Sequence, residues 1–300
     1  KDSFGMGRSR YPEPKRRKAV EKGRDESTGS NRRRQVRFKK TRKGKGLFVR
    51  IERRKPLTAN VGIVGVGHHT YWSQFDGLLD EMQAKLATFE AKVRQNGVET
   101  FAFGLLDDAE SAYTALPKMK AVDLDLLLID MVTYATSSTF GVLARELNVP
   151  IVLAALQPLR AMPYATAKTY TQLCNDDFCS VPEFTGVAIR MGKPVADVII
   201  GVREGDAEAD RELARWCQIA KVLHDLRRAR IGLMGHVLES MYDMHVDPTA
   251  VTAAFGCHVA LCEPDEILRH YLVEDRAAIE AMKARILDFF DTPDPVSDPI

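Results

Sequence analysis

Short apolar segments alternate with amphipathic helical segments from Leu57 onward, and this alternation restricts the fold more than any other feature of the chain. Aliphatic and β-branched residues dominate four short segments, as they do in buried parallel strands. These predicted strands are 61–66, 98–103, 124–130 and 150–156. Residues 74–96, 107–119 and 137–147, which lie between them, have the apolar spacing of helices. The pattern predicts an α/β domain, residues 57–191, with a doubly wound parallel sheet.

The alternation starts again after Met191, in a weaker form. Strands are predicted at 196–202, 229–234 and 257–262, and helices at 206–228, 247–254 and 264–290. We therefore expect two consecutive flavodoxin-like domains, of which the second, residues 192–300, is truncated.

A strongly basic leader, residues 1–56, precedes this body. Residues 1–55 hold 22 Lys or Arg against 6 Asp or Glu, whereas the rest holds 21 against 35, so the net charges are +16 and −14. Apolar residues are too few in the leader to offset the entropy of ordering it, and we expect disorder. An incidental extension is the preferred interpretation; contact with nucleic acid phosphates and a targeting role are the alternatives.

Composition indicates a cytoplasmic globular protein rather than a membrane protein. Hydrophobic residues make up 45% and charged residues 28%. No apolar run approaches the roughly 18–20 residues of a membrane-spanning helix. The five cysteines include no C-x-x-C motif, which favours reduced thiols.

Polar residues follow the predicted strands, where ligands bind in open parallel sheets. Gly65 and Gly67 suggest a dinucleotide site, but Thr70 stands where the third glycine of that fingerprint belongs. The hydroxyls, amides and imidazoles at the strand ends suit a neutral polyol better than a phosphate. A structural alternative stays open, in which His68 and His69 merely bond backbone groups.

Residues 61–71 resemble the opening strand and turn of bacterial L-arabinose isomerases. In that family the strand enters a Gly-x-Gln-His-x-Tyr turn; here His69 and Tyr71 match, and His68 takes the glutamine position. Residues 150–164 are similar to the segment after the family's fourth strand, where a glutamine corresponds to Gln157. Further matches are Ala161, Pro163, Tyr164, Glu183, Phe184, Gly186, Arg190, Met191, Gly235, Asp247, Phe255, Gly256 and Val259. The resemblance to the L-arabinose/L-fucose isomerase-like family covers about residues 60–290.

The resemblance implies an aldose–ketose isomerase that transfers a proton between C1 and C2 through an enediol. Two glutamates act as acid and base in that family, and a divalent metal, usually Mn²⁺, polarises the oxygens. Because these groups lie further along the family's sequence, we expect them beyond Ile300 and assign no catalytic or metal residue here. The prediction is therefore a fragment of such an enzyme, inactive as a 300-residue chain.

Four residues are assigned to the sugar by this resemblance: His68, Thr70, Tyr71 and Gln157. In the family the first domain completes the site of a neighbouring subunit, so the expected partners are a sugar and further copies in a trimer-based homo-oligomer. Histidine in place of glutamine changes the hydrogen-bonding capacity at position 68, which leaves the identity of the sugar open. The alternative function is a non-catalytic sugar-binding module that uses both domains of one chain.

Overall fold

The computed structural model describes residues 56–272 and 275–289, and the chain divides into two units. Val49–Val273 is the larger unit and holds all the strands of the described residues. The other consists of Lys1–Phe48 and Glu274–Ile300, and its described part is Asp275 with helix α9 (Arg276–Phe289). The predicted disorder of the basic leader falls, apart from Pro56, outside the described residues.

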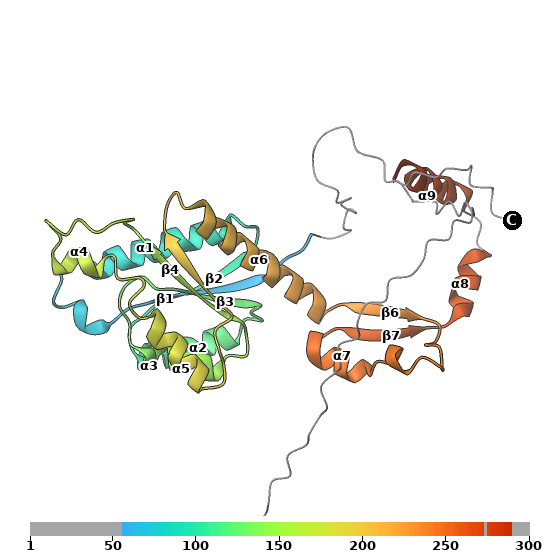
Figure 1. The fold of residues 1–300 in the computed structure, drawn as a ribbon, viewed down its shortest axis with the longest axis horizontal. Helices are drawn as coiled ribbons and strands as arrows, with labels where there is room; N and C mark the ends of the chain where they lie inside the picture. Colours follow the sequence, from blue (N-terminus) through green and yellow to red (C-terminus); the bar gives the residue numbers. More distant parts are fainter. Residues whose placement is uncertain (1–55, 273–274, 290–300) are drawn as a thin grey trace, which may run out of the picture. The chain divides into compact units, whose positions relative to one another are not determined.

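A five-stranded parallel sheet is the centre of the larger unit, which confirms the predicted α/β class (Figure 1). Every pair of neighbouring strands in this sheet is parallel. The strand order is β2-β1-β3-β4-β5. The strands are β1 (Asn60–Val66), β2 (Glu99–Leu106), β3 (Leu126–Asp130), β4 (Ile151–Gln157) and β5 (Asp197–Val202).

Helices cover both faces of this sheet (Figure 1). One face carries α2 (Ala109–Lys120), α3 (Ser137–Glu146) and α5 (Val181–Arg190). The other carries α1 (Leu78–Arg94) and α6 (Ala207–Arg227). Helix α1 begins four residues later than the predicted segment, because Gly77 adopts a left-handed conformation (φ 80°) at its N-cap.

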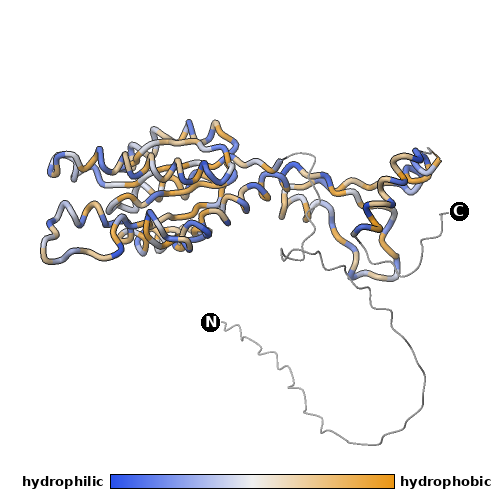
Figure 2. The backbone as a smooth tube through the Cα atoms, turned by 90° about the horizontal axis from the view of Figure 1, so that it is seen from above, coloured by the Kyte–Doolittle hydropathy of each residue, from blue (hydrophilic) through white to orange (hydrophobic). Residues whose placement is uncertain are grey.

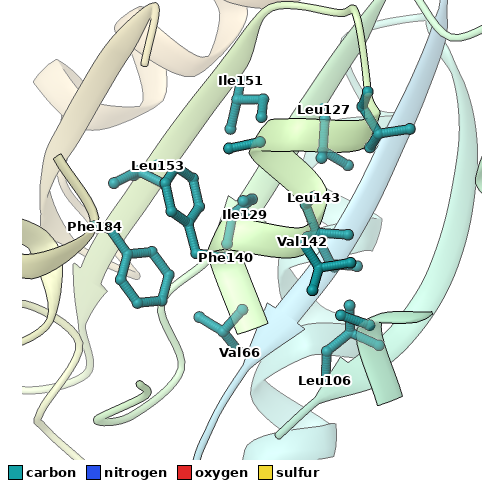
Figure 3. Close-up of a cluster of buried hydrophobic side chains, with 14 of the residues drawn as sticks. Val66, Leu106, Leu127, Ile129, Phe140, Val142, Leu143, Ile151, Leu153 and Phe184 are labelled. Atoms are coloured by element: carbon teal, nitrogen blue, oxygen red, sulfur yellow. The ribbon is translucent and has the colours of Figure 1, made fainter. Parts of the chain in front are cut away.

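Each face has its own apolar core. On the α2–α3–α5 face, Phe140 and Phe184 stack with ring centroids 4.8 Å apart, between side chains of the strands (Figure 3). All five residues of β3 are buried, and its first four form a continuous apolar run rather than an alternation. Each of these four aliphatic side chains contributes about 1.5–3 kcal/mol on burial.

Strand β5 belongs to the first sheet, although it lies beyond residue 192, where the sequence pattern placed the start of the second domain. It pairs with β4 from Asp197 to Val202 and closes the first sheet as its fifth strand, whereas the sequence pattern assigned residues 196–202 to a second domain. The reason is tertiary: α5, which the pattern did not indicate, returns the chain to the edge of β4.

Residues 229–272 contain a second, two-stranded parallel sheet. Its strands, β6 (Arg230–Met234) and β7 (His258–Cys262), are joined through helix α7 (Pro248–Phe255), and helix α8 (Pro264–Tyr271) follows. Figure 2 shows that apolar residues continue through this part of the chain. Its described strands do not make a complete doubly wound sheet, and truncation of a second domain stays a prediction.

None of the described helices is both long enough and apolar enough to cross a membrane. The cysteines of the described residues are free thiols, and Cys217 is fully buried on α6.

Candidate functional site

The carboxyl ends of β1 and β3 form the topological switch point of the sheet. Strand β1 has β2 on one side and β3 on the other, so the connections after these strands leave in opposite directions. Open parallel sheets bind ligands in the crevice at such a point. Here it is bordered by the turn after Val66 and by the loop after Asp130.

Three rings gather at this switch point: His68, Tyr71 and Tyr134. The His68 ring lies 5.3 Å from that of Tyr71 and 6.1 Å from that of Tyr134, and the two phenol rings are 6.3 Å apart. We call these residues the aromatic cluster. The geometry brings together two residues assigned from the sequence, His68 and Tyr71, and adds Tyr134, for which no role was predicted.

The turn after β1 is held rigidly behind the aromatic cluster. The Trp72 indole nitrogen donates to the Asp107 carboxylate at 2.7 Å, and a Cβ at position 67 would lie 2.9 Å from the Trp72 ring, so glycine is required there. Thr70, the third residue assigned to the sugar, is exposed on this turn, and its backbone carbonyl accepts from Gln74 at 2.9 Å. The structure thus does not bring Thr70 into the cluster.

Both phenols of the cluster are kept neutral. Burial raises the pKa of Tyr71, and Tyr134 and the Asp176 carboxylate raise it further. Burial likewise raises the pKa of Tyr134, with Glu183 and Asp176 among the contributing charges. Neutral phenols remain hydrogen-bond donors as well as acceptors, which suits a ligand rich in hydroxyl groups.

Gln157 lies at the end of β4 and lines a pocket of about 820 Å³. The pocket is formed by the loop after β4, by helix α4 (Thr169–Leu173) and by the segment that follows α4. Its lining includes amides, a carboxylate and two cationic side chains at Gln157, Arg160, Lys168, Gln172, Asn175 and Asp176. Gln157 is therefore not part of the aromatic cluster, but Asp176 lines the pocket and also acts electrostatically on both phenols of the cluster.

The segment 174–180, which we call the bridging loop, connects these two places. Asn175 accepts a hydrogen bond from the Gln157 amide through its backbone carbonyl at 2.7 Å and one from the Leu159 amide through Oδ1 at 3.0 Å. On the side of β3, the Ala135 amide donates to Ser180 Oγ at 2.9 Å. The loop after β3 and the loop after β4 are both fixed to it.

Four charged residues are buried beneath the bridging loop, and we call them the buried charge cluster: Lys85, Asp130, Asp177 and Arg203. The Arg203 guanidinium binds both oxygens of Asp130, at 2.7 and 3.0 Å, and donates to Asp177 at 3.0 Å. The Lys85 ammonium lies 2.9 Å from Asp177 and also donates to the carbonyls of Val132 and Cys174. Two positive and two negative charges balance one another in a site where all four side chains are buried.

Burial is the dominant influence on the pKa values of two members of this cluster, Lys85 and Asp177. It lowers the pKa of Lys85, against the attraction of Asp177. It raises the pKa of Asp177 to about 6, against the attraction of Lys85 and Arg203. The cluster joins α1, the ends of β3 and β5, and the bridging loop, so we assign it a structural role below the pocket.

Sequence reasoning missed the bridging loop and most of the buried charge cluster. One signal was present: Lys85 falls among the apolar positions of α1, on the face that packs against the sheet, where a lysine needs partners. Nothing in the sequence pattern indicated Asn175, Asp176 or Asp177, because their role depends on which loops the fold brings together.

The described residues contain no group of three or more His, Cys, Asp or Glu side chains that could hold a metal ion. The pocket lining has one carboxylate, Asp176, and two cationic side chains, Arg160 and Lys168, which would repel a divalent cation such as Mn²⁺. The expectation of Mn²⁺ ligands beyond Ile300 stays a prediction.

No family model matches the sequence, and no curated protein matches it either. Solved structures that are similar to it include a type II dehydroquinase from Propionibacterium acnes, with 10% identity over 53% of this chain and 98% of that chain. Another is Est24, a carbohydrate acetylesterase from Sinorhizobium meliloti, with 16% identity over 54% of this chain and 96% of that chain. Both have a TM-score of 0.30, so neither carries a functional argument.

Proposed function

We propose that residues 57–202 supply the sugar-facing wall of an aldose–ketose isomerase of the L-arabinose/L-fucose isomerase type. The observation that carries this proposal is the set of neutral hydrogen-bonding groups at the carboxyl edge of the sheet, with the Gln157 amide in a pocket and two neutral phenols at the switch point. The strand order β2-β1-β3-β4-β5 is that of flavodoxin-like folds and supports a ligand site at this edge.

The side chains of the wall would bind and orient the sugar rather than react with it. Gln157 can accept from and donate to hydroxyl groups, and the rings of Tyr71 and Tyr134 offer faces for the C–H groups of a sugar as well as phenolic donors. His68 would bond a hydroxyl in place of the family's glutamine, and Thr70 would contact the sugar from the exposed turn.

In this proposal the catalytic groups are not the sugar-binding side chains named above. A divalent metal, Mn²⁺ by resemblance, would stabilise the enediolate oxygens when bound, and glutamates would move the proton between C1 and C2. Such a site would be completed between copies of the chain in a trimer-based homo-oligomer in the cytoplasm. This chain alone would bind an open-chain pentose or 6-deoxyhexose weakly and would not convert it.

A titration followed by NMR tests the proposal. The 300-residue chain, labelled with ¹⁵N in its glutamine side chains, is titrated with L-arabinose and L-fucose. We expect the Gln157 signal to shift with a Kd on the order of 1 mM or weaker, while the signal of the exposed Gln218 on α6 stays in place. Gln157→Met identifies the signal and should abolish the response.

The other outcomes separate the alternatives. A response at Gln218 alone, or none at Gln157, would contradict the proposal. Micromolar affinity for the chain alone would favour the non-catalytic sugar-binding module. Conversion of aldose into ketose by the chain alone would show that the catalytic groups lie within it.

A further inference from the structure

Asn175 occupies a position in which every polar group of its side chain is used. The residue is 7% exposed, and its Nδ2 donates to the Thr171 carbonyl at 2.8 Å while Oδ1 accepts from the Leu159 amide at 3.0 Å. One side chain therefore joins α4 to the loop after β4, the two walls of the pocket.

The position of Asn175 fixes the orientation of the Gln157 side-chain amide. With the walls joined, the backbone carbonyl of Asn175 accepts from Nε2 of Gln157 at 2.7 Å. A carbonyl can only accept, so this contact fixes which end of the Gln157 amide faces the bridging loop. Among the described residues no hydrogen bond engages Oε1, which is thus the acceptor left for a ligand.

The backbone of Gln157 is also fixed, from the opposite side. Its carbonyl accepts from the Arg203 amide at 3.0 Å, and the Arg203 side chain belongs to the buried charge cluster below. The main chain of Gln157 therefore stays in place if its side chain loses the bond to Asn175. The side-chain amide can then change orientation by rotating about the side-chain bonds of Gln157.

We propose that Asn175 is a positioning residue that holds the Gln157 amide with its carbonyl oxygen toward the pocket, so that the pocket selects a ligand that donates a hydroxyl hydrogen at this point. The inference rests on the proposed function for the identity of the ligand, but the orientation of the amide does not depend on it. Asn175 lines the pocket, but the polar groups of its side chain are already used by Thr171 and Leu159.

The test uses the same glutamine-labelled chain without ligand and then with L-arabinose. Asn175→Leu keeps the volume of the side chain but removes both of its hydrogen bonds, and Asn175→Ala removes them while leaving space for water. We expect either variant to move the Gln157 side-chain signal to that of a solvated amide and to weaken L-arabinose binding about five- to tenfold, the effect of about one lost hydrogen bond.

Two controls separate positioning from loss of stability. Gln172→Met removes a neighbouring amide of the same pocket, and Leu213→Ala destabilises α6 at a buried site; both should leave the Gln157 signal in place. An unchanged Gln157 signal in the folded Asn175 variants would overturn the inference, and so would the same displacement in Leu213→Ala. If the signal moves as expected while L-arabinose and L-fucose have no effect on the unmodified chain, positioning stands and the proposed function fails.

Discussion

Strands β3 and β6 are similar in sequence character and opposite in their surroundings. Both are five-residue parallel strands, LLLID and RIGLM, with a parallel partner. All of β3 is buried, whereas all of β6 is exposed, with Ile231 at 47% and Met234 at 59%. An apolar run therefore predicts a strand, but its burial depends on helices that lie on both faces of the sheet.

The comparison extends to charge. The charges of the buried charge cluster balance one another beside the five-stranded sheet, which is possible because strand ends, α1 and the bridging loop converge on them. In residues 229–272 the ion pairs lie at the surface, as Arg269 with Asp265 does, and they contribute little to stability. Of these two regions, the five-stranded sheet is the one in which buried ion pairs hold loops in place.

Removal of one buried charge should have the largest effect. Arg203→Met leaves Asp130 and Asp177 with Lys85 as their only cation of the cluster, so we expect a loss of about 3–5 kcal/mol in the free energy of unfolding. Urea unfolding of the chain measures it. Arg215→Met, which removes an exposed pair with Glu212 on α6, serves as the control and should cost less than about 1 kcal/mol. Equal losses would show that the cluster is not the tight buried network described above.

Matched leucine substitutions test the difference in burial directly. Leu128→Ala in β3 empties a fully buried site and should cost about 2–5 kcal/mol. Leu233→Ala in β6, where the side chain is 39% exposed, should cost less than about 1 kcal/mol. Both are measured by urea unfolding followed by circular dichroism. A large cost at Leu233 would mean that β6 is covered in solution, and the comparison of the two strands would lose its basis.

The pH dependence of stability examines Asp177. Its pKa in the folded state, about 6, lies above the ordinary 3.8, so the folded chain holds this proton more tightly than the unfolded chain does. The contribution to stability is complete below about pH 4 and is lost as the pH rises through about 6.

Asp177→Asn removes this dependence and provides the measurement. The unfolding free energy of the unmodified chain, less that of Asp177→Asn, should fall by roughly 3 kcal/mol from about pH 4 to about pH 7. Asp210→Asn, which removes an exposed partner of Lys92, is the control. The unfolding free energy of the unmodified chain, less that of Asp210→Asn, should change by less than about 1 kcal/mol over the same pH range. A rise with pH would show instead that Lys85 and Arg203 outweigh burial.

Much of the fold could be predicted from local pattern. The predicted bounds of three strands, 61–66, 124–130 and 150–156, lie within a few residues of β1, β3 and β4. A short aliphatic run between helical segments is compatible with few structures other than a buried strand. The fifth strand was predicted as an element but assigned to another domain, since the sequence does not state which sheet edge a strand will join.

The candidate site could be predicted only in part. His68 and Tyr71 come together because they follow one strand at the switch point, which a strand-end rule anticipates. Asn175 could not be found in that way, because it lies 18 residues from the Gln157 amide that it holds and outside any strand end.

The sequence by itself determined that this chain forms parallel strands crossed by helices, and that polar side chains follow the ends of those strands, because both follow from residue spacing along the chain. The tertiary structure alone decided that β5 joins β4, that Lys85, Asp130, Asp177 and Arg203 neutralise one another, and which end of Gln157 faces the pocket. These contacts join residues distant in sequence, and their energies exist only once the fold has brought the partners together and excluded water.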